Sequence, residues 1–271
     1  MNIFFTGHRG FLGRELIPEI ERDFKVHKFP GNLLDFDLLQ RFVIDHKIDK
    51  VIQAAARGGR RVREDSPHTL AENFAISVNI RNLGLPTLHF CSGAIYNRDR
   101  SINEASEGDS LFSYPNDFYG QSKFLSNYLA KDREDCVTLR YFNVFGKSEG
   151  RDRFITFNLI QYIKRQPMIV FKDFQMDFFY VQDTIPVLTS WINGANLPKE
   201  INLVYREKLF LSDVCTIINN LSDHIVPIDV QDTARAKNYT GSGKVFESLK
   251  LHHLGLKSGI DEMYEYLKSI A

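Results

Sequence analysis

The sequence predicts an α/β protein in which a doubly wound parallel sheet is followed by a smaller C-terminal lobe. Three observations lead to this prediction. Short apolar runs alternate with amphipathic stretches through the first half of the chain. A glycine-rich turn follows the first apolar run, and the alternation loosens after Gly146. We therefore expect a first domain over residues 1–146 and a ligand-binding lobe over residues 147–271, with some later segments returning to the first domain.

The spacing of the apolar residues predicts the individual elements. Strands are expected at residues 3–5, 25–29, 50–54, 87–92 and 137–142. Helices are expected at residues 13–22, 38–46, 69–83 and 121–131, although Pro18 interrupts the first of them. In the second part, helices are expected at 154–164, 213–221 and 260–270, and extended segments at 168–171 and 178–181.

The composition excludes several classes of protein. The 34 Lys and Arg residues balance the 34 Asp and Glu residues, so no overall field favours nucleic acid or an anionic membrane. Cys91, Cys136 and Cys215 are far apart and form no C-x-x-C pair, which predicts neither a metal site nor a disulfide framework. No segment reads as a signal peptide or a membrane span. We expect a protein of the reducing cytoplasm.

Residues 6–13 read TGHRGFLG and place Gly7, Gly10 and Gly13 between a strand and a helix. Glycine allows a tight turn and a close approach of the backbone to a pyrophosphate, while the helix N-terminus offers free N–H groups. The position of the pattern at a strand–helix junction predicts a Rossmann-type dinucleotide site. Phe11 and Leu12, between the last two glycines, belong to the same cofactor-binding loop.

The charges near this loop favour NADP(H) over NAD. An NAD site usually has an acidic residue about 20 residues after the loop. Here that stretch reads VHKFPGN, with Lys28 and no acid, and Arg9 lies in the loop itself. Two cations suit a 2′-phosphate. Asp35, next to Leu34 in NLLDFD, could bind the adenine amine or cap the helix that follows.

Tyr119 and Lys123 in the segment YGQSK are spaced to lie one turn apart on the same helix face. An ammonium group beside a phenol favours the phenolate, so such a tyrosine can exchange a proton with a carbonyl or an alcohol. The lysine can also hold the nicotinamide ribose. Ser92 ends a predicted strand, where open parallel sheets bind ligands, and its hydroxyl can orient the reacting oxygen. These three residues form the predicted catalytic group.

These segments together resemble the extended short-chain dehydrogenase/reductases that act on nucleotide sugars. The matching segments are TGHRGFLG, VIQAAA with Ala54, Ala55 and Ala56, CSGAIY, YGQSK and LRYFNVFG. Within the family, GHRG, NLLD, AAAR followed by GG, and LHHLGL resemble the GDP-L-fucose synthases, which reduce and epimerise a 4-keto-6-deoxy sugar with NADPH. The resemblance implies cofactor contacts at the alanines, a nucleotide-sugar substrate, NADP and a homodimer.

Three positions depart from the family pattern. Met176 replaces the Arg that usually opens the motif read here as MDFFYVQD. The fucose synthases use a Cys two residues after the serine and a His after the sixth strand, where this chain has Ala94 and Arg153. Alanine cannot titrate and arginine is hard to deprotonate. We therefore expect carbonyl reduction, with carbon epimerisation by the family's route in doubt.

The substrate side is less marked in the sequence. Asn143 resembles a substrate-contacting Asn of the family, and Asn73 resembles an Asn near its active site. Substrate contacts are expected from Asn143, Arg153 and Ser92, and further cations that could bind a diphosphate are Arg206, Arg235 and Lys237. The cluster Arg57, Arg60, Arg61 and Arg63 lacks an aromatic stacking platform for RNA and is interpreted as a mobile loop over the ligands.

Three functions remain open from the sequence. The first is an NADP(H)-dependent reductase of a nucleotide-activated 4-keto-6-deoxy sugar. The second is a nucleotide-sugar 4-epimerase that retains NAD. The third is a non-catalytic NADP-binding sensor or interaction module. A 4,6-dehydratase is disfavoured because Gly93 and Ala94 stand where those enzymes have an Asp-Glu pair.

Overall fold

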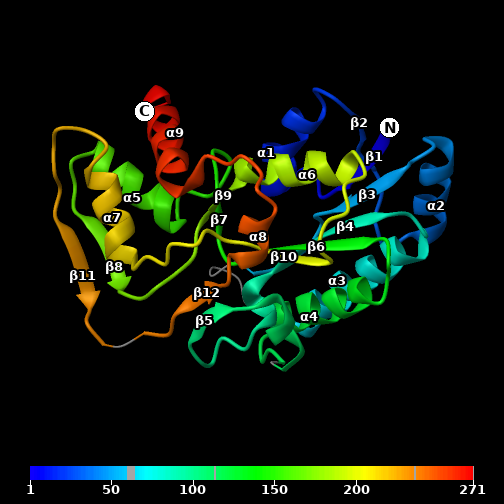
Figure 1. Cartoon of the computed structure of the whole chain (residues 1–271), viewed down its shortest axis with the longest axis horizontal. Coiled ribbons are helices and arrows are strands. Elements are labelled where there is room, and N and C mark those ends of the chain that lie inside the picture. The colour runs from blue at the N-terminus through cyan, green and yellow to red at the C-terminus, as the bar shows by residue number, and fades with distance from the viewer. Residues whose placement is uncertain (60–64, 113, 235, 271) are drawn as a thin grey trace.

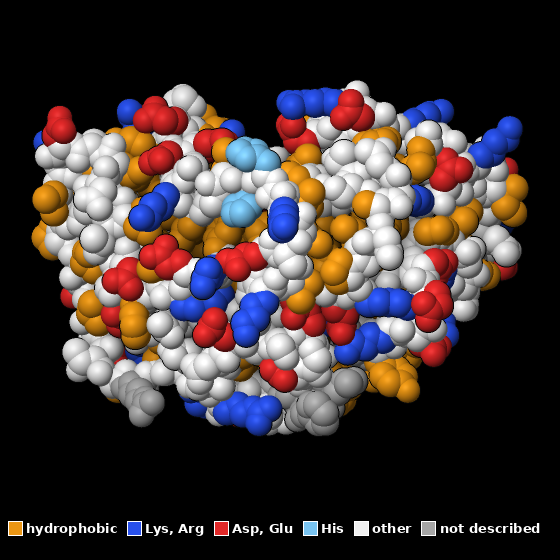
Figure 2. All heavy atoms as spheres, viewed as in Figure 1, with side chains coloured by type: hydrophobic (Ala, Val, Ile, Leu, Met, Phe, Trp, Pro, Cys, Tyr) orange, Lys and Arg blue, Asp and Glu red, His pale blue; other side chains and the backbone are white. Residues whose placement is uncertain are grey.

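The computed structural model describes residues 1–59, 65–112, 114–234 and 236–270. It has a helix-covered sheet and, beside it, a smaller lobe that contains α5, α7, α9, β8 and β11 (Figure 1). Lys/Arg and Asp/Glu side chains are interspersed on the face shown in Figure 2, with no broad area of one sign. Neither the overall charge nor this face therefore favours a polyanionic partner.

Within the described residues, the central sheet has six parallel strands in the order β10-β6-β4-β3-β1-β2. Its strands are β1 (Asn2–Thr6), β2 (Lys25–His27), β3 (Lys50–Gln53), β4 (Thr87–Ser92), β6 (Cys136–Tyr141) and β10 (Glu200–Leu203). The covering helices are α1 (Phe11–Ile20), α2 (Phe36–Asp45), α3 (Pro67–Asn82), α4 (Phe118–Lys131), α6 (Ile185–Ile192) and α8 (Lys244–Ser248). The parallel, doubly wound α/β fold predicted from the sequence is confirmed.

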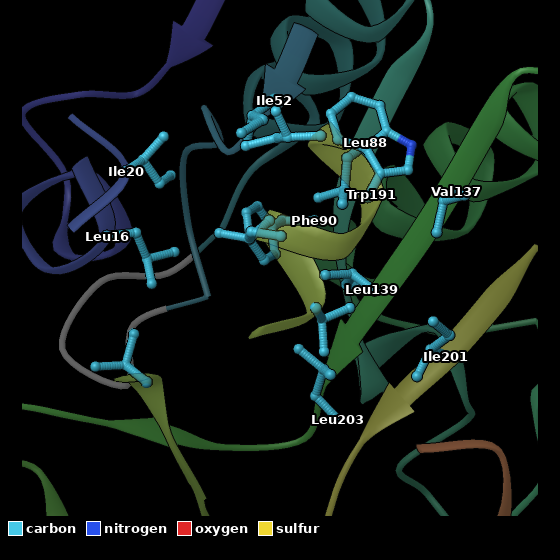
Figure 3. Packing of buried hydrophobic residues seen from close by; sticks show 14 of the residues in the cluster. Leu16, Ile20, Ile52, Leu88, Phe90, Val137, Leu139, Trp191, Ile201 and Leu203 are labelled. Carbon is cyan, nitrogen blue, oxygen red and sulfur yellow. The ribbon is translucent and has the colours of Figure 1, made fainter. Parts of the chain in front are cut away.

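Both faces of the sheet are buried, which explains why its strands read as continuous apolar runs. Ile3 and Phe5 of β1 pack in the cluster on the α1 and α6 side, whereas Phe4 packs on the other side with residues of α2 and α3. Figure 3 shows the first cluster, in which Trp191 of α6 lies over the sheet. Burying each large apolar side chain stabilises the fold by about 1.5–3 kcal/mol.

The smaller lobe has its own apolar core, which includes Leu159, Val170, Val214 and Met263. Its elements are β7 (Val144–Phe145), α5 (Phe154–Ile163), β8 (Met168–Lys172), β9 (Phe179–Tyr180), α7 (Leu211–Asn219), β11 (Ile228–Asp232) and α9 (Gly255–Ser269). Strand pairs β8–β11 and β7–β9 are parallel. A third parallel pair joins β5 (Ile102–Ala105), from the first half of the chain, to β12 (Tyr239–Gly241). Three short 3-10 helices are η1 (Gly93–Ile95), η2 (Glu107–Phe112) and η3 (Val181–Thr184).

Several helix starts differ from the predicted ones because of the turn or the cap that precedes the helix. Helix α1 begins at Phe11, directly after the glycine turn, and continues through Pro18. Helix α4 begins at Phe118 because Asp117 accepts a hydrogen bond from Gly120 N. Helix α9 begins at Gly255, five residues before the predicted start, because the carboxylate of Asp183 binds the N–H groups of Leu254 and Gly255 at 2.7 and 2.9 Å.

Candidate active site

The glycine loop brings the ends of β1 and β3 together. Gly7 has a φ of +73°, and a Cβ at this position would lie 2.9 Å from the Cα and N atoms of Ala55. Thr6 Oγ1 accepts hydrogen bonds from Ala54 N and Ala55 N, both at 3.0 Å. Only a residue without a side chain fits between the two strand ends, and the backbone is left open to a close ligand.

The first turn of α1 is also shaped to approach a ligand. Gly10 precedes the helix, and no side chain caps its N-terminus. A Cβ on Gly13 would lie 2.6 Å from the backbone of His8, so the loop folds directly onto the helix. Phe11 and Leu12 pack partly against the core and leave their N–H groups at the helix end. Free N–H groups and a partial positive charge fit a pyrophosphate, so the loop suits the dinucleotide that its sequence predicts.

The two cations expected to select NADP lie near this loop. Burial, and then the charges of Arg9 and Lys28, lower the pKa of His8. Lys28 Nζ also lies 2.8 Å from Glu21 Oε1, and both side chains are partly exposed. Arg9 is exposed. A 2′-phosphate contact by Lys28 would therefore compete with its ion pair to Glu21.

Asp35 acts as the N-cap of α2. Its Oδ1 accepts a hydrogen bond from Leu38 N at 3.0 Å. The second interpretation made from the sequence, a helix cap, is thus observed, and an adenine contact stays a prediction for its other oxygen. Leu34 is exposed next to it, and Ala56 is exposed beyond the end of β3.

Tyr119 and Lys123 meet at the carboxyl end of β4. The buried Lys123 ammonium donates a hydrogen bond to Phe90 O at 3.0 Å and lies 5.9 Å from the centre of the Tyr119 ring. Ser92 is the last residue of the same strand. A Cβ on Gly120 would lie 2.6 Å from Ala94 O, so a glycine at this point lets α4 approach the serine segment. The structure therefore brings the two predicted catalytic segments into contact.

Asn73 joins the loop after β3 to the same helix. Its Nδ2 donates to Arg57 O at 2.9 Å and to Ser122 Oγ at 3.0 Å, and its Oδ1 accepts from Arg57 N at 2.8 Å. A Cβ on Gly59 would lie 2.8 Å from Cζ of Tyr119, so the loop backbone covers one side of the phenol. The side chain of Arg57 pairs with a glutamate of α3. Arg60, Arg61 and Arg63 lie outside the described residues.

Two residues beside the predicted catalytic group were missed in the sequence. Arg98 binds Asp117 at 2.8 Å. Burial alone would lower the pKa of Arg98, but Asp117 and the phenols of Tyr239 and Tyr119 raise it overall. The hydroxyl of Tyr239, from β12, lies against the serine segment, 2.8 Å from the place of a Cβ on Gly93. Arg98 lies only six residues after Ser92, so its closeness in the sequence could have marked it as a neighbour of the site. No sequence pattern marks Tyr239.

The substrate residues expected from the sequence have structural partners. Asn143 Nδ2 donates to Asp177 O at 3.2 Å, which links the end of β6 to the segment before β9. Arg153 precedes α5, and its Nε lies 3.9 Å from Glu149 Oε2. Arg206 and Lys237 are exposed, and Arg235 lies outside the described residues.

Two buried carboxyl groups lie next to the cofactor loop. Glu15 of α1 accepts hydrogen bonds from Ser148 N and from Gln182 Nε2. Burial raises the pKa of Glu149 to about 7, although Thr156 and Arg153 lower it, and Glu15 raises it further. Glu15 thus connects α1 to the segment after β7 and to η3, whereas the bond from Thr156 to Glu149 lies within the smaller lobe.

In the described part of the chain, the cysteines are free and no metal-ligand cluster is present. Cys91, Cys136 and Cys215 are buried and unbridged. No three His, Cys, Asp or Glu side chains there are grouped closely enough to hold a metal ion. No described helix combines the length and the apolar character needed to cross a membrane.

Comparison with known sequences gives one family match and distant relatives. Residues 3–203 match the model of the NAD dependent epimerase/dehydratase family. The ADP-L-glycero-D-manno-heptose-6-epimerase of Pseudomonas aeruginosa is 26% identical over 197 residues, covering 61% of this chain and 58% of that protein. The chain thus spans less than two thirds of the length of this relative.

Solved structures share the fold over nearly the whole chain. They include UDP-glucuronic acid 4-epimerase from Bacillus cereus with UDP-glucuronic acid and NAD (TM-score 0.81, 19% identity, 100% of both chains). GDP-mannoheptose C4 reductase from Campylobacter jejuni with NADP has a TM-score of 0.82 at 16% identity, over 98% of both chains. A GDP-L-fucose synthetase from Naegleria fowleri bound to NADP has a TM-score of 0.81 at 16% identity, over 99% of this chain and 92% of that one.

At such identities the structural similarity shows a common fold. The family model matches the sequence itself over residues 3–203, which include the glycine loop, the serine strand and the Tyr/Lys helix described above. The chain belongs to the NAD dependent epimerase/dehydratase family.

Proposed function

We propose that the protein is an NADP(H)-dependent reductase of a nucleotide-activated 4-keto-6-deoxy sugar. The observation that carries this proposal is the convergence of Tyr119 and Lys123 with the strand end that holds Ser92. A carbonyl bound at this point would receive a proton from the tyrosine and a hydrogen bond from the serine. The ammonium of Lys123 lies 5.9 Å from the centre of the phenol ring and would hold the nicotinamide ribose.

The cofactor side of the proposal rests on the glycine loop. Gly7, Gly10 and Gly13 with the start of α1 would hold the pyrophosphate. Arg9 and Lys28, whose charges both act on His8 of this loop, would favour a 2′-phosphate. When bound, the nicotinamide supplies the hydride that reduces the carbonyl carbon. The resemblance of GHRG, NLLD and LHHLGL to the GDP-L-fucose synthases supports NADP and a GDP-linked sugar.

Carbon epimerisation by the fucose synthase route is not part of the proposal. Ala94 is buried and has no titratable group, and Arg153 is engaged with Glu149. No acid or base therefore stands at either position that the family uses to invert carbon centres. Reduction of the carbonyl needs neither residue.

A second candidate function is a nucleotide-sugar 4-epimerase with retained NAD. Two of the similar proteins are named as epimerases, and this favours the second candidate. They are the heptose epimerase and the UDP-glucuronic acid 4-epimerase. The same Tyr, Lys and Ser would serve both reactions. Tightly bound NAD in the purified protein, with interconversion of sugars without added cofactor, would support the epimerase and contradict the reductase.

The test is turnover with a panel of nucleotide 4-keto sugars, followed by the absorbance of NADPH. We expect one member to be reduced by the natural sequence and Tyr119→Phe to lose at least about 10²-fold in kcat, because no proton donor remains. Tyr128→Phe, on the exposed side of the same helix, serves as the control and should retain full activity.

Two results of this test would contradict the reductase. Turnover that survives in Tyr119→Phe would show that the catalytic assignment is wrong. NADP binding without turnover of any sugar in the panel would favour the non-catalytic module.

A further inference from the structure

Two glycines follow Arg57 in the loop after β3, and both have left-handed backbone. The φ angle is +86° at Gly58 and +73° at Gly59. A Cβ on Gly58 would overlap the carboxylate of Asp65. A Cβ on Gly59 would lie 2.8, 2.9 and 3.0 Å from Cζ, Cε1 and Cε2 of Tyr119. Glycine therefore lets this backbone pass between a carboxylate and the phenol that donates the proton in the proposed reaction.

The carboxylate of Asp65 holds the second of these glycines. Its two oxygens accept from Gly59 N, at 3.2 Å for Oδ1 and 3.1 Å for Oδ2. Asp65 directly precedes Ser66, the N-cap of α3, whose N–H donates to Thr69 Oγ1 at 3.3 Å. Because a charged acceptor makes a stronger hydrogen bond than a neutral one, the start of α3 fixes the Gly59 peptide.

A second attachment holds the other end of the same segment. Asn73 of α3 binds both backbone polar groups of Arg57, with Oδ1 2.8 Å from the N atom and Nδ2 2.9 Å from the O atom. The same Nδ2 donates to Ser122 of α4, the helix that carries Tyr119. The described part of the loop is therefore attached to α3 at Arg57 and at Gly59, while α3 itself is bound to α4.

The contact with the loop lies at the reactive end of the phenol. Cζ, Cε1 and Cε2 are the ring atoms closest to the Tyr119 hydroxyl, and all three face the Gly59 backbone. This backbone stops the hydroxyl end of the ring from swinging towards the loop. Proton transfer needs the donor within hydrogen-bond reach of the carbonyl oxygen, and a displacement of about 1 Å can cost about 10²-fold in rate.

We propose that Asp65 is a positioning residue that, by binding Gly59, keeps the phenol of Tyr119 in the orientation needed for proton transfer. The proposal rests on the proposed reductase, in which Tyr119 is the proton donor. Asp65 acts through the loop backbone rather than on the reacting atoms. The glycine pair after AAAR thus has a function of its own, separate from the cofactor contacts expected of the alanines.

Nitration of the tyrosines by tetranitromethane tests the contact without any substrate. Tyr266, which is partly exposed on α9 of the other lobe, serves as the internal standard. We expect Asp65→Ala to raise the nitration rate of Tyr119 at least about threefold relative to Tyr266, because the loop loses an attachment and opens more often. Asp65→Asn keeps an acceptor oxygen for Gly59 N and should restore the natural rate. Mass spectrometry of the peptides measures both rates.

Turnover gives the second readout. Asp65→Ala should lower kcat about tenfold with KM unchanged, because a displaced phenol impairs proton transfer and leaves substrate binding intact. Asp65→Asn should stay within about twofold of the natural kcat, since it retains the hydrogen bond. Asp213→Ala is the matched control. It also removes a carboxylate that accepts a backbone N–H, from Phe210 at 2.9 Å, but it does so in the smaller lobe and should leave kcat unchanged.

The outcomes separate this role from the proposed reaction. A nitration rate of Tyr119 that is unchanged in Asp65→Ala, or raised equally in Asp65→Asn, would overturn the proposal. Faster nitration with an unchanged kcat would overturn the positioning role. A natural chain that turns over no sugar would contradict the reductase, and nitration would still decide whether Asp65 holds the loop against Tyr119.

Discussion

At the scale of single residues, the carboxyl group of Glu149 links the stability of the fold to pH. Its side chain is 5% exposed, and its acceptor bond from Thr156 Oγ1 is 2.5 Å long. Because burial is the largest effect, the group holds its proton to about pH 7 in the folded chain, against an ordinary pKa of 4.5. Folding therefore takes up a proton between these two values.

This proton uptake predicts how stability depends on pH. Below about pH 4.5, Glu149 is protonated in both states and contributes no penalty, whereas between pH 4.5 and pH 7 the free energy of unfolding falls as pH rises. Glu149→Gln should thus stabilise the protein at pH 8 by up to about 3 kcal/mol, from about 1.4 kcal/mol for each pKa unit. The advantage should disappear near pH 4.5.

Urea unfolding at several pH values measures this difference. Glu134→Gln is the control, because the Glu134 side chain is fully exposed and should give a small, nearly constant difference. A Glu149→Gln variant no more stable than the natural chain at pH 8 would contradict a raised pKa.

At the scale of elements, the turn between β1 and α1 requires a glycine at position 7. The backbone there has a positive φ and lies too close to Ala55 for a side chain. Gly7 and Gly84 both have positive φ, +73° and +68°. A Cβ on Gly7 would meet the backbone of Ala55, whereas a Cβ on Gly84, after α3, would meet nothing within 4 Å. A substitution at Gly84 therefore measures the cost of backbone strain alone. A substitution at Gly7 measures the same strain together with the close approach to Ala55.

Alanine at the two positions should have unequal effects. Gly84→Ala should lower the free energy of unfolding by about 1–2 kcal/mol, the cost of a left-handed residue. Gly7→Ala should cost more, and it should also weaken NADPH binding at least about tenfold, because the strand ends must separate. Urea unfolding and fluorescence titration with NADPH measure both quantities. Equal losses at the two sites would contradict the close contact with Ala55.

The elements that the sequence predicted well are those with long or strongly patterned segments. Thr87–Ser92 is a strand with the predicted bounds, and the Tyr/Lys helix lies where its motif requires. β10 and α6 were missed because a four-residue strand and an eight-residue helix that is apolar on most sides have no clear period. The Tyr239 contact was missed because it depends on the pairing of β12 with β5, which no local pattern encodes.

At the scale of the whole molecule, the family resemblance implies a homodimer that pairs through helices of the first domain. Helices α3 and α4 pack side by side below the sheet in Figure 1. Tyr128 of α4 is 64% exposed, which leaves a large apolar ring on the outer side of this pair. We propose that this ring lies in the contact between two copies.

The dimer proposal predicts that a charge placed in the contact lowers the mass of the protein in solution. The natural chain should sediment as a dimer and Tyr128→Arg as a monomer, because a buried contact does not accept an unpaired charge. Ile225→Arg is the control, since Ile225 is 80% exposed between α7 and β11 in the other lobe and should leave the dimer intact. A natural chain that sediments as a monomer, or a Tyr128→Arg dimer, would contradict the proposed interface.

The pairing of β5 with β12 also has a consequence for synthesis of the chain. It joins residues such as Glu104 and Thr240, which are 136 positions apart. A ribosome that has completed the entire central sheet, through β10, has not yet made Tyr239. A nascent chain of that length contains the dinucleotide loop, but it still lacks the Tyr239 ring that packs on Phe142 beside the serine segment. The surroundings of the serine segment are therefore completed near the end of translation, after the residues of the glycine loop and the central sheet.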